Sequence, residues 1–281
     1  MAKTSIIIPS RNEFYEISPG MTVLQRTVQD VYEKATGDFE VIVGFDGPPY
    51  QDFPKLPNLS LVKMAEPIGL KRLLNRLCLM SSGKYIYKTD SHCMFGEGFD
   101  EILQADMEDN WVVTPRFYVL DAENWRWQDD RFYDYFYLSC PFTDRNQFKF
   151  KAGGHWQELT QEKLDVLIDE TPQIHGSGWF LTKEYYFNCL GGFPTIDPMG
   201  HAQEPPYLCF KTYLGPWGGS VKVNKKTWYA HMHKGAQRPN GYAYSRGQTR
   251  YSYDLAAKYW MGNQWEQRIH DIDWFIKKFM P

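Results

Sequence analysis

Apolar, strand-like runs alternate with amphipathic segments through the N-terminal part of this chain, and that order limits the folds it can adopt. Runs such as SIIIP and YIYKT are typical of buried strands, whereas 20–37 and 68–83 place apolar residues at helical spacing. Strands that alternate with helices predict a parallel sheet with helices packed on its faces. We therefore predict an α/β protein with helices on both faces of a parallel sheet, arranged as one large domain or two small ones.

Polar side chains follow the predicted strands at their carboxyl ends. Arg11 and Glu13 follow the first strand, Asp46 follows the second, and Asp90 and His92 follow the strand KYIYKT. Sheets of this kind bind their ligands at the carboxyl ends of the strands. We expect these side chains to gather at one ligand site.

Asp90 and His92 are two residues apart, so in an extended segment both side chains point to one side. A carboxylate with an imidazole suits Mn²⁺ or another divalent metal of intermediate softness better than Ca²⁺. His231 and His233 share one side of a later strand, and either could supply a third ligand. The alternative is that Asp90 caps a turn beside a surface histidine.

The sequence also argues against several classes of protein. It contains no G-K-[ST] phosphate loop, no H-E-x-x-H and no G-x-S-x-G motif. No uncharged apolar stretch approaches the ~18 residues of a membrane span, and the five cysteines form no C-x-x-C pair. We expect a soluble, unsecreted protein of the reducing cytoplasm, without a membrane partner. The 10 tryptophans indicate either a sugar-binding surface or a bulky core.

A family resemblance lies in the order of short blocks along the chain. PSRNE, VIVGFDG, GLKR, KTDSHCMF, GSGWF, LGGF, QEP and AHMHK follow one another as in GT-A glycosyltransferases, and the chain most resembles the polypeptide N-acetylgalactosaminyltransferases. The four residues DSHC at 90–93 carry it most specifically. The resemblance covers 5–89 well, 91–170 poorly and 176–261 moderately. It implies a nucleotide-sugar-dependent hexosyl- or N-acetylhexosaminyl-transferase. It also implies a single GT-A domain with a Rossmann-like, mixed and mainly parallel α/β sheet flanked by helices.

The resemblance divides that domain into four parts. They are a nucleotide-binding half (1–99), a variable aromatic insert (100–175), an acceptor and sugar half (176–235), and a lid with C-terminal helices (236–281). The MGHAQEP segment departs from the W-G-G-E of the family, which leaves the transferred sugar open.

The resemblance also implies roles for single residues. Asp90, His92 and His231 would bind Mn²⁺ or Mg²⁺, and Glu204 would be the catalytic residue between donor and acceptor. The residues expected to contact the UDP-sugar donor are Pro9, Arg11, Glu13, Asp46, Arg72, Gly178, Trp179 and Lys234. Three alternatives remain: Asp46 could cap a turn, Glu204 could be a helix N-terminal charge, and Trp179 could belong to the core.

The acceptor is suggested by the charge pattern of 205–253, which contains no Asp or Glu. Its basic residues are Lys211, Lys222, Lys225, Lys226, Lys234, Arg238, Arg246 and Arg250. Basic residues interleaved with aromatic rings can bind nucleic acid. The chain also resembles virus-encoded enzymes that glycosylate hydroxymethylated pyrimidines in DNA, which would place it in the host cytoplasm. We therefore favour a 5-hydroxymethylpyrimidine base in DNA as the acceptor. Arg238, Tyr242, Arg246 and Arg250 would then contact the DNA.

Three other functions stay open. The first is transfer to a glycan or protein hydroxyl, which the net charge of -3 favours. The second is a non-catalytic module that binds sugar nucleotides. The third is a metal-dependent hydrolase that uses Asp90 and His92 with His231 and His233.

Overall fold

The computed structural model describes residues 3–139, 151–194, 203–233, 241–242 and 245–279. The strands are β1 (Thr4–Ser10), β2 (Glu16–Ser18), β3 (Met21–Thr22), β4 (Phe39–Phe45), β5 (Leu59–Lys63), β6 (Tyr85–Thr89), β7 (Cys93–Phe95), β8 (Trp111–Asp121), β9 (Arg126–Tyr133), β10 (Phe136–Ser139), β11 (Lys151–His155), β12 (Ile168–Glu170), β13 (Gly178–Thr182) and β14 (Ser220–His231). The helices are α1 (Val23–Lys34), α2 (Leu70–Met80), α3 (Phe99–Ala105), α4 (Gln157–Glu162), α5 (Glu204–Leu214), α6 (Arg246–Met261) and α7 (Ile272–Phe279), with a π-helical turn η1 (Tyr185–Cys189).

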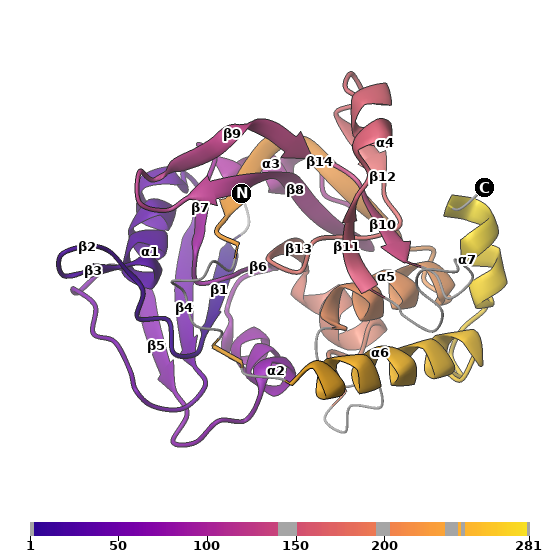
Figure 1. The fold of residues 1–281 in the computed structure, drawn as a ribbon, viewed down its shortest axis with the longest axis horizontal. Helices are drawn as coiled ribbons and strands as arrows, with labels where there is room; N and C mark the ends of the chain where they lie inside the picture. Colours follow the sequence, from indigo (N-terminus) through magenta and orange to yellow (C-terminus); the bar gives the residue numbers. More distant parts are fainter. Residues whose placement is uncertain (1–2, 140–150, 195–202, 234–240, 243–244, 280–281) are drawn as a thin grey trace.

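A ten-stranded sheet forms the centre of the protein (Figure 1). Its main path runs β12-β14-β8-β13-β6-β1-β4-β5, while β7 pairs with β14 and β9 with β8. The block β6-β1-β4-β5 is parallel, as is the β14-β8 pair. The strands β13, β12, β7 and β9 pair antiparallel with their neighbours. The predicted α/β class is confirmed, with the continuous parallel block confined to the N-terminal half.

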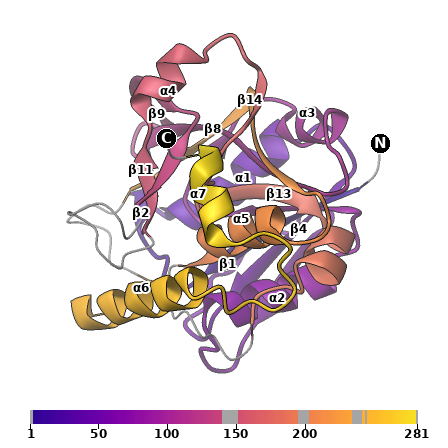
Figure 2. The same cartoon turned by 90° about the vertical axis from the view of Figure 1, so that its right-hand side faces the viewer.

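Helices cover both faces of the sheet because successive strand side chains point to opposite sides. In β1, Ile7 packs into a core that includes α2, α5, α6 and α7, whereas Ile6 and Ile8 pack into a core with α1 and α3. Figure 2 shows α5 and α7 against the sheet and α6 below them. All three isoleucines are fully buried, and each stabilises the fold by about 1.5–3 kcal/mol relative to exposure.

Two predicted helices have different bounds in the structure. The periodicity of QELTQEKLDVLIDE predicts one helix over 157–170, but α4 ends at Glu162 and 168–170 form the edge strand β12 on β14. Pairing with β14 therefore overrides the local pattern. The sequence near 254–261 also predicts a helix, but this helix begins earlier, because Ser245 and Gln248 form a capping box that starts α6 at Arg246.

Strand β14 changes register where it runs along β8. Ser220 to Asn224 pair in step with β8, and a second run pairs Trp228 to His231 with Arg116 to Val119. Between Asn224 and Trp228 the strand carries extra residues, as in a β-bulge. The side-chain alternation of one half of β14 therefore does not fix that of the other half.

Candidate metal and donor site

The predicted metal pair lies in the short link between two strands. β6 ends at Thr89 and β7 begins at Cys93, so Asp90, Ser91 and His92 form the connection. β7 pairs with the end of β14, placing Cys93 opposite His231. The Met232 amide also donates to the His92 carbonyl at 3.0 Å. Backbone pairing thus brings His231 to Asp90 and His92 from far along the sequence.

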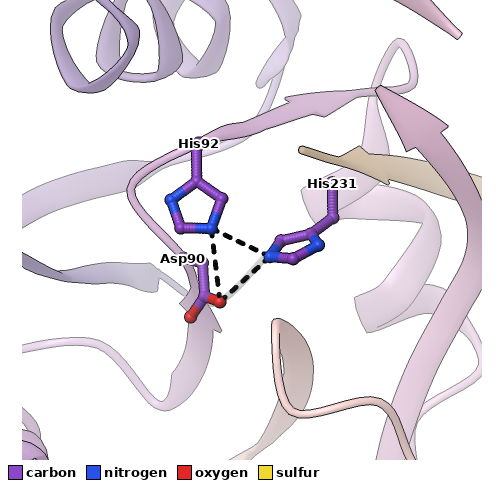
Figure 3. Close-up of side chains that lie close together, drawn as sticks. All are labelled: Asp90, His92 and His231. Atoms are coloured by element: carbon purple, nitrogen blue, oxygen red, sulfur yellow. Dashed lines mark hydrogen bonds and ion pairs between the residues drawn. The ribbon is translucent and has the colours of Figure 1, made fainter. Parts of the chain in front are cut away.

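Asp90, His92 and His231 point toward one another (Figure 3). The Nε2 atoms of the two imidazoles are 2.9 Å apart. Oδ2 of Asp90 lies 3.2 Å from Nε2 of His231 and 3.8 Å from Nε2 of His92. His92 and His231 are buried, and Asp90 is partly exposed. The predicted residues therefore form one compact cluster with a side open to ligands.

This geometry fits a divalent cation. Adjacent ligands at about 2.1 Å from an octahedral ion are roughly 3 Å apart, close to the two shorter separations in the cluster. One carboxylate with two imidazoles suits Mn²⁺, Zn²⁺ or a similar ion. Burial lowers the pKa of His231 well below its usual range, despite the neighbouring Asp90, so that imidazole is neutral and able to ligate. Three protein ligands leave further positions for substrate oxygens or water.

Two charged residues, Lys88 and Glu13, each contact one member of the cluster. Lys88 is 3% exposed, and its ammonium donates to Oδ1 of Asp90 and to the carbonyl of Gly176. Burial opposes ionisation of Asp90, but Lys88 and the two imidazoles hold its pKa well below the usual range. Glu13, also buried, lies against the far side of His92. Asp90 is thus a carboxylate whose Oδ2 faces the imidazoles.

The comparisons with known proteins identify the family. Residues 5–174 match the profile described as Glycosyl transferase family 2. The chain belongs to this glycosyl transferase family. A Caenorhabditis elegans relative, polypeptide N-acetylgalactosaminyltransferase 5, is 26% identical over 242 residues, covering 79% of this chain and 36% of the relative. This family 2 chain therefore spans little more than a third of that protein.

Two solved structures share its architecture. GalNAc-T7, crystallised with UDP, GalNAc and Mn²⁺, matches 99% of this chain and 55% of its own, with a TM-score of 0.63 and 13% identity. The mannosyltransferase PcManGT from Pyrobaculum calidifontis, in complex with GDP-Man and Mn²⁺, matches 84% of this chain and 58% of its own, with a TM-score of 0.50 and 14% identity. The predicted GT-A fold is confirmed.

Several residues predicted to contact the nucleotide hold one another in place. Arg11 donates through Nη1 to the carbonyl of Asp46 at 2.6 Å. The Asp46 carboxylate is fully buried and accepts from the amides of Ile68 and Gly69, where α2 begins. Asp46 therefore holds the backbone amides that precede α2, whereas the alternative considered from the sequence was that it caps a turn. Pro9 is buried within β1.

Three other predicted donor contacts have different surroundings. Arg72 is exposed on α2 and lines a pocket of about 470 Å³ with Asn75 and Arg76. Trp179 is fully buried and stacks on Tyr186 in the core, so the alternative of a core residue describes its placement, and its ring offers no surface to a sugar. Gly178 packs closely against another strand, because a Cβ there would lie 2.9 Å from the Tyr229 ring.

Glu204 is the first residue of α5 and is largely buried. A Cβ built at Gly176 would lie 3.1 Å from Cγ of Pro205, the residue after Glu204. The Gly176 carbonyl accepts a hydrogen bond from Lys88. The start of α5 thus lies against the loop that holds Lys88 on Asp90. Glu204 also occupies the helix N-terminal position considered from the sequence.

The predicted acceptor contacts are placed in part. The Arg11 guanidinium carbon lies 5.9 Å from the centroid of the Tyr242 ring. Arg250 is exposed on α6. Lys234, Arg238 and the side chain of Arg246 lie outside the described residues.

Sequence reasoning missed Lys88 and gave Glu13 a different role. The available signal for Lys88 was its spacing, because a lysine two residues before Asp90 in a buried strand points to the same side. Over the part of the chain that the structure describes, none of the helices has the length and apolarity to cross a bilayer.

Proposed function

We propose that this chain transfers a sugar from a nucleoside diphosphate donor to a hydroxyl acceptor, with a divalent cation held by Asp90, His92 and His231. The observation that carries the proposal is the convergence of one carboxylate oxygen and two imidazole nitrogens within 4.8 Å of one another. The Mn²⁺ and the UDP or GDP-Man named for the two structural neighbours support the cation and the donor class. UDP is our choice of nucleotide, because GalNAc-T7 matches nearly the whole chain.

The chemistry that a bound divalent ion would supply is stabilisation of negative charge on the departing diphosphate. The chain's own residues prepare the site for it. Lys88 keeps Asp90 ionised and oriented, and burial keeps His231 neutral. Glu204, at the start of α5, is the carboxylate that we assign to the acceptor hydroxyl, either as its general base or as a charge beside the anomeric carbon.

The first acceptor class that we propose is a protein or glycan hydroxyl. The name of the curated relative supports it, and so does the placement of three lysines from the basic segment. Lys211 donates to the Leu190 carbonyl, Lys225 lies in a fully buried pair with Asp134, and Lys226 pairs with Asp106 at 2.8 Å. Lysines held in this way are not available to phosphates.

DNA carrying hydroxymethylpyrimidines is the second candidate acceptor. Arg250 is exposed on α6, and its neighbour Tyr251 is 64% exposed. A cation beside an aromatic ring is an arrangement that grips single-stranded or flipped bases. The burial pattern leaves the N-terminal half of α6 open to a partner, and one end of this helix projects from the body (Figure 2).

The experiment supplies Mn²⁺ with a panel of UDP- and GDP-sugars and measures both donor hydrolysis and transfer. Acceptors are a serine- and threonine-rich peptide, an oligosaccharide, and DNA with or without 5-hydroxymethyl bases, each analysed by mass. We expect Mn²⁺-dependent release of the nucleoside diphosphate, abolished by EDTA and by Asp90→Asn. Full activity in EDTA would contradict the metal. Phosphate or ester cleavage without any sugar nucleotide would indicate the hydrolase, and donor binding without turnover would indicate the binding module.

A further inference from the structure

Glu13 is a buried carboxylate that the fold directs at a metal-ligand candidate. It is 5% exposed, and its Oε2 lies 2.9 Å from Nδ1 of His92 and 3.0 Å from the Ser91 hydroxyl. Its backbone carbonyl accepts from the Gln51 side chain, and Gln51 also contacts the Thr22 hydroxyl that caps α1. Glu13 is therefore fixed at both its backbone and its carboxylate.

The contact determines which nitrogen of His92 carries the proton. An ionised carboxylate only accepts hydrogen bonds, so Nδ1 of His92 must donate to it. A neutral imidazole that carries its proton on Nδ1 has its lone pair on Nε2. That nitrogen is the atom that faces Nε2 of His231 and Oδ2 of Asp90. Glu13 thus aims the lone pair of His92 at the position predicted for the cation.

The other imidazole has no comparable support among the described residues. Nδ1 of His231 is buried and has no hydrogen-bond partner within the part of the chain that the structure describes. With Nε2 of His92 unprotonated, His231 donates from its own Nε2 across the 2.9 Å separation. Of the two imidazoles, only His92 is held in the ligating tautomer before a cation arrives.

Glu13 also determines the charge of the site. The positive Lys88 offsets the negative Asp90, which it contacts directly, and burial keeps His231 neutral. Glu13 adds a second carboxylate, in contact with His92. A buried negative charge in contact with one ligand increases the attraction for a cation.

We propose that Glu13 is a positioning residue for the metal site, which fixes the tautomer and the ring orientation of His92 and supplies the negative charge that draws the cation in. The inference rests on the proposed function, because it assumes that Asp90, His92 and His231 bind a metal. It replaces the contact with the UDP-sugar donor that the sequence resemblance implied for Glu13.

The first test compares Mn²⁺ affinity in the wild type, Glu13→Gln and Glu16→Gln. Glutamine keeps the size of Glu13 and can still accept from His92, but it removes the charge. We expect the dissociation constant for Mn²⁺, measured by titration with electron paramagnetic resonance of the free ion, to rise at least about tenfold in Glu13→Gln. The exposed Glu16, on strand β2, is the matched control, and its substitution should leave the constant unchanged.

The second test reads the tautomer in the metal-free wild type by nitrogen-15 NMR of the histidine rings, with His92→Gln to assign the signal. We expect His92 to carry its proton on Nδ1, and Glu13→Ala to release that preference. A proton on Nε2 in the wild type would overturn the inference even if every Glu13 variant failed to fold. So would unchanged Mn²⁺ affinity in a folded Glu13→Gln protein. A wild type that binds no Mn²⁺ would instead overturn the proposed function, while the tautomer would still report on Glu13.

Discussion

Replacing Lys88 by methionine should reveal the electrostatic design of the site in a measurement of stability. Methionine matches the unbranched lysine stem and removes only the ammonium. The change leaves the Asp90 carboxylate, which is 29% exposed, and the carbonyl of Gly176 without that donor. Breaking a buried pair by removing one partner costs about 3–5 kcal/mol. Because Asp90 keeps some solvent and both imidazoles, we expect a loss of about 3 kcal/mol in the free energy of unfolding.

Mn²⁺ should then narrow the difference in the free energy of unfolding between Lys88→Met and the wild type. An ammonium and a divalent ion bound to one carboxylate repel each other by several kcal/mol, even at an effective dielectric constant of about 20. The variant should therefore bind Mn²⁺ more tightly and gain more stability from it, since a ligand at 100 times its dissociation constant stabilises the folded state by about 2.7 kcal/mol. This gain exceeds the cost of a less firmly oriented Asp90.

Urea unfolding with and without Mn²⁺ measures both effects. Lys84→Met is the matched control, because Lys84 pairs with Asp109 at 3.0 Å on the surface, where the side chains are 49% and 78% exposed. We expect that control to lose at most about 1 kcal/mol and to respond to Mn²⁺ like the wild type. A loss below about 1 kcal/mol in Lys88→Met, or a difference that widens with Mn²⁺, would refute the reasoning.

Three further predictions concern pH and packing. Burial lowers the pKa of His175 from 6.5 to about 3, so the unfolded chain binds the extra proton between these values, and the free energy of unfolding should fall by about 1.4 kcal/mol per unit as pH drops from 6 to 4. His175→Gln should remove that share of the slope in urea titrations, and an unchanged slope would contradict the assignment. Asp30→Ala leaves the Phe95 amide and the Trp125 indole without their acceptor and should lower the free energy of unfolding by about 3 kcal/mol. As a control, Glu33→Ala at an exposed position of the same helix should cause no measurable loss of stability. Gly178→Ala forces the Tyr229 ring to move and should lower stability by about 1–3 kcal/mol with an altered near-ultraviolet circular dichroism spectrum; an unaltered spectrum at full stability would show that the strands can spread.

The sequence was most informative where a local pattern has one structural solution. A buried strand followed by D-S-H placed Asp90 and His92 on one side of the chain, and H-x-H at the end of β14 supplied His231 or His233 as the third member. The choice of His231 came from the family resemblance. In the structure it follows from the pairing of β7 with β14, a contact between distant segments that periodicity does not encode.

The remaining features depended on tertiary partners. Trp179 belongs to an apolar stretch that could face a sugar or the core, and the packing of Tyr186 decides for the core. Lys211, Lys225 and Lys226 form part of a basic run in the sequence, yet their partners Leu190, Asp134 and Asp106 lie elsewhere in the chain. Local charge counting could not separate lysines held within the fold from lysines free to meet a substrate.

The bulge in β14 lies between the part of the strand that carries His231 and the part that packs into the core, so the side to which each part turns its side chains is set separately. Strand side chains alternate, so a slip of one residue would turn His231 away and present Ala230 or Met232 in its place. Because the register of β14 on β8 already changes between Asn224 and Trp228, an insertion or deletion there could remove the third ligand while Val221 and Val223 remain packed. That short segment is where a relative could lose or regain its cation without rebuilding its interior.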